Sequence, residues 1–139
     1  MTIKKPHIYI VLLLTIYTLT SCTEANTSDA KDTYKYWVGT NPPADLKLLN
    51  GQYWKSAHWS KEYIMYLKFK PTNKWWDGFL KQNSISKDNG TWTVPSDIPI
   101  WFKPSDNSVR FRGSDDFDQG SRYFRDSLSG ICYIYEIQL

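Results

Sequence analysis

The stretch YIMYLKFK at positions 63–70 decides the fold, because its side chains alternate in character along the chain. An alternation of period two places successive side chains on opposite faces of a β-strand. One face carries Tyr63, Met65, Leu67 and Phe69, and the other carries Ile64, Tyr66, Lys68 and Lys70. The stretch therefore predicts a strand with one strongly apolar face.

A second strand is expected just before this one. Residues 52–59 are rich in β-prone aromatic residues, although they alternate less regularly. The polar tripeptide 60–62 can turn that segment back against 63–70, and the two together predict a β-hairpin.

A helix is expected just after the strand. Pro71 ends the strand, and Thr72 or Asn73 can cap a helix that runs to about Gln82. One stripe of this helix carries Trp75, Trp76, Phe79 and Leu80. Gly78 inside the helix costs about 1 kcal/mol relative to alanine, so either a close backbone contact compensates for it or the helix is short.

The remainder of the chain predicts three further strands. Residues 83–107 are dense in Pro, Ser, Asp and Asn and predict an ordered loop. Short strands are expected at 109–112, 122–125 and 131–139, with 127–130 joining the last two as a hairpin. Residues 46–139 thus predict one small α+β domain, an antiparallel sheet of about five strands covered by one helix.

The segment that precedes this domain predicts a tether. Residues 23–35 are rich in Thr, Ser, Asp, Asn and Ala and have no apolar periodicity. Such a segment buries too little apolar surface to offset the entropy lost on ordering. We therefore expect 22–45 to be a flexible linker, with a reach of roughly 20 Å for about a dozen residues.

The first residues predict an export signal. Lys4 and Lys5 form a basic start, and residues 8–19 form an uncharged apolar run. Twelve residues are too few for a transmembrane helix, which needs about 20. By itself, such a segment also fits an ordinary secretory signal or an uncleaved anchor.

The run ends in Leu19-Thr20-Ser21-Cys22, which resembles the lipobox of bacterial lipoproteins. The resemblance covers the signal alone. It implies that residues 1–21 are removed as a signal peptide, that Cys22 carries thioether-linked diacylglycerol, and that lipid anchors the protein to the cell envelope. In such lipoproteins of enterobacteria, an Asp after the cysteine retains the protein in the inner membrane. Thr23 at that position favours the outer membrane if the source is Gram-negative.

Removal of the signal changes the charge and cysteine counts of the chain. From Cys22 onward there are 15 basic and 14 acidic residues, a formal net charge of +1, which disfavours nucleic-acid binding. His58 is the only histidine left, and it is expected to be exposed or packed rather than catalytic. Cys132 loses its only potential intramolecular disulfide partner and is expected in the core.

The acidic run 114–120 is the segment closest to a recognisable site. Asp115, Asp116 and Asp118 lie within four positions, but they lack the spacing of a calcium loop. A loop linked to Arg110, Arg112, Arg122 or Arg125 by ion pairs is favoured over a metal site. No catalytic motif is present, and no cofactor is expected.

The abundance of aromatic residues predicts binding. Seven Trp, eight Tyr and six Phe follow residue 21, more than a domain of this size buries fully, so several rings should stay partly exposed. The candidates lie in the 83–107 loop: Trp92, Trp101 and Phe102. Two hypotheses follow, a protein-binding module of the envelope, of inhibitor or immunity type, and a module that binds polysaccharide or peptidoglycan. A purely structural envelope protein is the third possibility.

Overall fold

The computed structural model describes residues 23–58, 60, 62–114 and 118–139, and it contains one antiparallel sheet with two helices. The strands of the sheet are β1 (Ala25–Thr27), β2 (Lys47–Lys55), β3 (Tyr63–Lys70), β4 (Ser86–Lys87), β5 (Ser108–Arg112), β6 (Arg122–Asp126) and β7 (Cys132–Gln138). The helices are α2 (Ala30–Val38) and α3 (Asn73–Gln82). The α+β class is confirmed, with a larger sheet than predicted.

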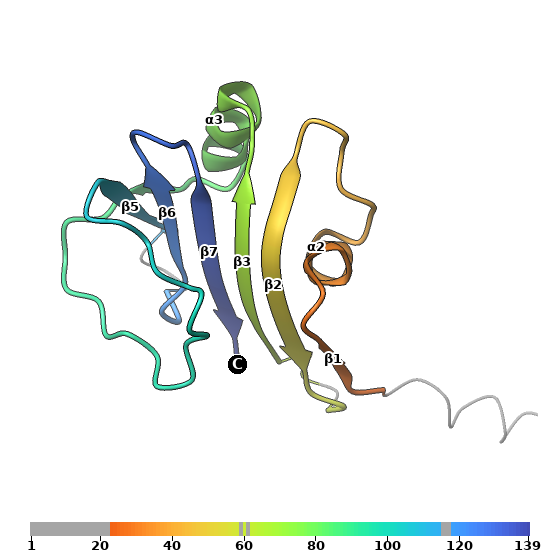
Figure 1. The fold of residues 1–139 in the computed structure, drawn as a ribbon. Coiled ribbons are helices and arrows are strands. Elements are labelled where there is room, and N and C mark those ends of the chain that lie inside the picture. Colours follow the sequence, from red (N-terminus) through yellow and green to blue (C-terminus); the bar gives the residue numbers. More distant parts are fainter. Residues whose placement is uncertain (1–22, 59, 61, 115–117) are drawn as a thin grey trace, which may run out of the picture.

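The sheet has the order β1-β2-β3-β7-β6-β5-β4, and each neighbouring pair is antiparallel (Figure 1). The predicted strand at 63–70 is confirmed as β3, and it lies between β2 and β7. The predicted hairpins are also confirmed, since β2 pairs with β3 and β6 pairs with β7. Gly130, at a φ of 70°, helps to close the second one.

The two faces of the sheet are covered differently. Both helices pack on the same face, where β3 contributes Met65, Leu67 and Phe69 to a core that includes Trp76 of α3 and Tyr34 of α2. The opposite face is covered by the loop between β4 and β5, which runs over β6 in Figure 1. Its core consists of Tyr66, Phe102, Phe124, Tyr133 and Tyr135.

Helix α3 forms as predicted. The Thr72 side chain accepts a hydrogen bond from the Trp75 N–H at 3.2 Å, which caps the first turn. Trp76 is buried at 2% exposure, as its place on the apolar stripe indicates. Cys132 is a free, fully buried cysteine, so its expected place in the core is also confirmed.

The expected flexible tether is wrong for the residues that the structure describes. Residues 25–27 form β1, which pairs with β2, and residues 30–38 form α2. Two local signals stabilise this segment without apolar periodicity. The Asp29 side chain caps α2 by accepting hydrogen bonds from the N–H groups of Lys31 and Asp32, and Gly39 ends it in the left-handed conformation.

Helix α2 sits unusually close to β2 at Gly51. A Cβ at this glycine would lie 2.7 Å from the Ala30 Cα and 2.6 Å from the Thr33 Oγ1. Thr33 is fully buried, and its hydroxyl donates to the Asp29 carbonyl at 2.7 Å. The absence of a side chain at Gly51 is therefore what allows the helix to dock.

We expect Gly51→Ala to destabilise the protein by about 2–3 kcal/mol, because the added methyl group forces the α2 backbone away from the sheet. The measurement is the free energy of unfolding in urea. Gly113→Ala is the matched control, since a Cβ there meets no atom within 4 Å. Equal stabilities of the two variants would contradict the docking described here.

Candidate functional site

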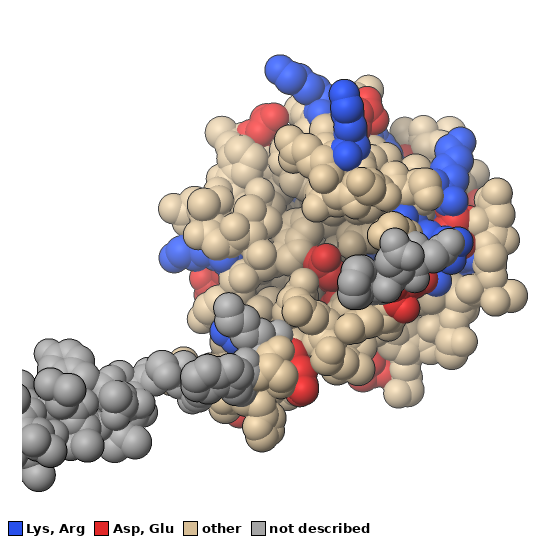
Figure 2. Space-filling model, turned by 180° about the vertical axis from the view of Figure 1, so that it is seen from behind, with Lys and Arg blue, Asp and Glu red and all other residues tan. Residues whose placement is uncertain are grey.

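The candidate site is a cavity of about 710 Å³ on the helix face of the sheet. A volume of this size suits a small ligand or a protruding side chain. Seen from behind, the surface is hollowed near its centre, and an acidic side chain lies in the hollow (Figure 2). The cavity is lined by Tyr34, Trp37 and Val38 of α2, Lys74, Trp75, Gly78, Phe79 and Gln82 of α3, and Asp45, Asn83, Tyr123 and Glu136.

Aromatic rings in mutual contact form most of the lining. The Phe79 ring stacks on Trp75 at 5.3 Å between centroids and meets Trp37 and Tyr123 edge to face at 5.7 and 5.6 Å. Tyr34 continues the wall through Trp37 at 5.9 Å. These contacts join α2, α3 and β6 through Phe79, so the lining is held in place by packing.

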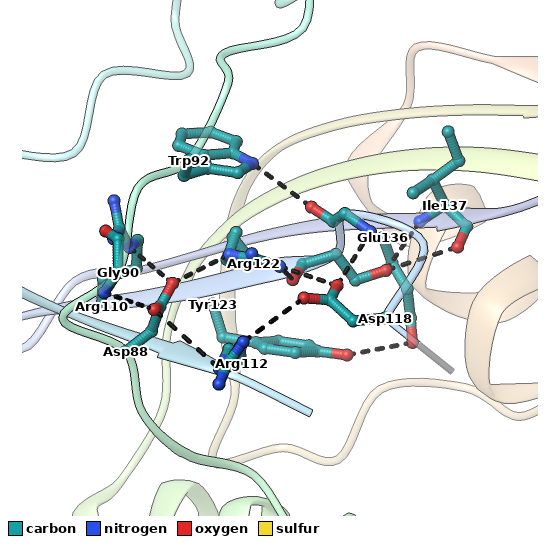
Figure 3. Close-up of polar contacts among 12 residues, drawn as sticks. Asp88, Gly90, Trp92, Arg110, Arg112, Asp118, Arg122, Tyr123, Glu136 and Ile137 are labelled. Carbon is teal, nitrogen blue, oxygen red and sulfur yellow. Dashed lines mark hydrogen bonds and ion pairs between the residues drawn. The ribbon is translucent and has the colours of Figure 1, made fainter. Parts of the chain in front are cut away.

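Glu136 brings a carboxylate into this apolar surface. The residue lies on β7 opposite Met65, and Cys132 and Ile134 precede it on the same face. It therefore occupies a position of the core face where an apolar residue is expected. The Tyr123 hydroxyl donates to Glu136 Oε1 at 3.3 Å, and this bond is drawn in Figure 3.

The second carboxylate oxygen, Glu136 Oε2, is buried without a hydrogen-bond partner. Among the described residues no Lys, Arg or His nitrogen lies within 4 Å of this carboxylate. Burial raises the pKa of Glu136, and the neighbouring donor groups of Trp37 and Tyr123 only partly oppose that rise. An unpaired buried carboxylate costs stability, so its position beside a cavity makes Glu136 a candidate functional residue.

The hydroxyl groups around Glu136 stay protonated at neutral pH. Burial, followed by the negative charge of Glu136, raises the pKa of Tyr53, Tyr63 and Tyr123 above the ordinary value. Tyr53 and Tyr63 stack at 5.7 Å between ring centroids. The carboxylate is therefore bordered by neutral phenols.

The predicted aromatic candidates lie on the other face of the sheet. Phe102 is 3% exposed and forms part of the core there, so its proposed place in a binding surface is wrong. Trp92 packs on Phe124 at 5.3 Å, and its Nε1 donates to the Gly120 carbonyl at 3.3 Å. Trp101 lies beside Phe102 at 6.0 Å and is half-buried. The structure brings these rings together, but as packing for the loop.

Ion pairs fasten the start of the loop between β4 and β5, where Asp88 follows β4 (Figure 3). The Asp88 carboxylate, whose side chain is 2% exposed, lies 2.9 Å from the Nε atoms of both Arg110 and Arg122. Burial would raise the pKa of Asp88, but the Gly90 N–H and the two guanidinium groups outweigh it, and the pKa is lowered. Asp88 is thus an ionised anchor rather than a proton donor.

Asp118 belongs to the same network. Its Oδ1 accepts from Arg122 at 2.8 Å, and its Oδ2 lies 4.0 Å from Arg112. The sequence-based preference for an ion-paired loop is confirmed for this residue, whereas Asp115 and Asp116 lie outside the described residues. No group of three potential metal ligands occurs in the part of the chain that the structure describes.

Glu136 was missed because the acidic residues of the sequence are scattered. In the sequence, the more apolar side of the last predicted strand is the opposite one, which carries Ile131, Tyr133, Tyr135, Ile137 and Leu139, so the structure is needed to show where Glu136 faces. In the last predicted strand, Cys132 and Ile134 share a side with Glu136, and that side faces the core. A carboxylate on the core-facing side of a strand is a stronger indication of a site than an acidic run in a loop.

Comparison with protein-family models, with curated proteins and with solved structures found no match for this chain. Within the described ranges, none of the helices has the length and apolar character needed to cross a membrane.

We expect Glu136→Gln to stabilise the protein by about 1 kcal/mol at pH 7, because it removes a buried charge without a counter-charge. Because the pKa of Glu136 is raised in the folded state, its protonated form favours folding. This contribution is fully present below the unfolded pKa of about 4.5 and is lost as the pH rises through the folded pKa. The gain should therefore vanish below about pH 4.

The measurement is urea unfolding of wild type and variant between pH 3.5 and 8. Asp77→Asn, which removes an exposed carboxylate of α3, is the matched control. A Glu136→Gln variant that is less stable than wild type at pH 7 would show that the carboxylate is structurally required.

Proposed function

We propose that this protein is a lipid-anchored binding module of the bacterial cell envelope, and that it recognises its partner through the cavity between α2 and α3. The observation that carries the proposal is the buried, unpaired carboxylate of Glu136 at the floor of an aromatic-walled cavity. Rigid aromatic anchors around a few polar groups are the usual composition of a recognition site.

The glycine in the middle of α3 supports this location. Gly78 lines the cavity, and a Cβ there would meet no atom within 4 Å, so packing does not require a glycine. A helix-interior glycine nonetheless costs about 1 kcal/mol relative to alanine. The lack of a side chain keeps this part of the cavity free, which is useful if a ligand enters there.

The opposite face is less suited to recognition. Trp92 and Phe102 are engaged with Phe124, and the loop is fastened by the ion pairs of Asp88. A flat aromatic platform for sugars is therefore not free there. A glycan remains the second candidate ligand for the helix-face cavity, because stacked Trp75 and Phe79 rings beside a carboxylate also suit a sugar ring and its hydroxyl groups.

The proposed anchor would hold the domain close to the bilayer. Only Thr23 and Glu24 separate Cys22 from β1, and Glu24 Oε1 accepts a hydrogen bond from Trp54 at 3.0 Å. Three Cα–Cα steps span at most about 11 Å. A lipid on Cys22 would thus place the domain near the headgroups, without the roughly 20 Å reach that a flexible tether provides.

We expect Cys22→Ser to abolish incorporation of an alkyne-labelled fatty acid in a bacterial host, because a hydroxyl cannot form the thioether. Cys132→Ala, which changes the only other cysteine, should keep the label. Gel fluorescence after coupling of a dye to the alkyne is the measurement. Label that persists in Cys22→Ser, or that is absent from wild type, would refute the lipid anchor.

The cavity is tested by site-specific photocrosslinking in intact cells. A photoreactive residue at Gln82, which lines the cavity and is exposed, should form a discrete protein adduct. The same residue at Val94, exposed in the loop of the opposite face, should not. Gly78→Leu should reduce the Gln82 adduct at least about tenfold by filling the cavity, whereas Gly78→Ala should leave it within about twofold.

Three results would each have a defined meaning. An adduct that forms equally from Val94, or that survives Gly78→Leu, would place recognition elsewhere. Retention of the protein on insoluble peptidoglycan, lost in Gly78→Leu and without any protein adduct, would favour the glycan candidate. No adduct and no retention would contradict a binding role for the cavity.

A further inference from the structure

Resting on the proposed binding role of the cavity, we infer that its ligand carries a single positive charge, an alkylammonium or guanidinium group, which sits against Glu136 between the aromatic rings. This inference names the chemistry of the ligand. It does not depend on whether that group belongs to a small amine or to a protein side chain.

The charges in the cavity favour a cation. The charged residues of its lining are Asp45, Glu136 and Lys74, so negative charge is in excess by one. Lys74 and Asp45 are exposed at the rim, whereas Glu136 lies at the floor. The described residues supply no cation within ion-pair distance of Glu136, so a ligand can supply it.

The Glu136 oxygen without a hydrogen-bond partner favours a ligand whose donor group is charged. Oε2 is buried and has no hydrogen-bond partner, while Oε1 already accepts from Tyr123. A charged N–H donor forms a stronger hydrogen bond to a carboxylate than a neutral hydroxyl does. A charged donor also opposes the rise in the pKa of Glu136 that burial causes, and a neutral sugar hydroxyl opposes it less.

The rings of the cavity provide the remaining surface for such a group. Phe79 contacts Trp37 at 5.7 Å and Trp75 at 5.3 Å between ring centroids, and all three rings line the cavity. Aromatic faces attract ammonium and guanidinium groups, and their apolar surface suits the methylene chain that bears the charge. The two cation–ring contacts found among the described residues involve Tyr133 and Trp76, which do not line this cavity.

The test is a titration of the mature acylated protein in lipid nanodiscs, followed by tryptophan fluorescence and calorimetry. The probes are n-butylammonium against 1-butanol, and a blocked lysine peptide against the norleucine peptide of the same length. We expect each cation to bind at least about tenfold more tightly than its neutral counterpart. Binding of butylammonium alone points to a free amine, and binding of the lysine peptide as well points to a protein side chain.

Two variants with opposite expected effects keep the test independent of folding. Glu136→Gln should weaken cation binding at least about tenfold. Lys74→Glu, at an exposed rim position, should strengthen it about threefold. Asp77→Asn is the control, since it removes an exposed carboxylate that does not line the cavity, and it should leave binding unchanged.

Equal binding of charged and neutral probes, or cation binding that Glu136→Gln and Lys74→Glu leave unchanged, would overturn the inference. So would the absence of binding by every probe. The proposed function has its own separate test: if the Gln82 adduct is formed and is lost in Gly78→Leu while no cation binds, the cavity recognises a partner through other chemistry. If that adduct never depends on the cavity, the proposed function fails as well.

Discussion

The close approach of α2 to Gly51 is the constraint on which the rest of this molecule depends. With Thr33 and Ala30 in contact with the bare backbone of β2, the helix lies flat on the sheet and carries Tyr34 and Trp37 toward α3. Without this contact α3 would be alone on that face, and the cavity would have no second wall. The same contact helps to hold β1 and α2, which follow Cys22 in the chain, as parts of the domain.

The two faces of the sheet then serve different purposes. On one face a loop packs its rings against the sheet and is fastened by the buried Asp88 between two arginines. Every charge in that group has an opposite charge beside it. On the other face Glu136 is buried without one, in a cavity that Gly78 leaves open. The buried charge on the first face is paired and the one on the second is not, a difference that is expected where a ligand completes a site.

Much of the fold follows from the sequence, and the parts that do not have physical reasons. The alternation in 63–70 and the capped aromatic stripe of 73–82 are strong local signals, and both elements form where predicted. Strand β1 and helix α2 were not predictable from apolar periodicity. A short edge strand is held by backbone hydrogen bonds, and α2 buries only Thr33 and Tyr34. The capping residues Asp29 and Gly39 were the available signals.

The candidate site was less accessible to sequence reasoning than the fold. A loop rich in tryptophan and breakers resembles an exposed binding surface, but whether such rings face solvent depends on what lies beneath them. Here Phe124 and Tyr135 lie beneath Trp92 and take up its surface. Glu136 is one acidic residue among fourteen, and only the register of β7 with β3 shows that it faces the helices.

Hydrogen–deuterium exchange of the acylated protein, alone and with its bound partner, tests the central claim most directly. Recognition through the helix-face cavity predicts that binding slows amide exchange in α2 (Ala30–Val38) and α3 (Asn73–Gln82) and leaves the 88–107 loop unchanged. Slowed exchange confined to the 88–107 loop would contradict the account and return the binding surface to the aromatic loop.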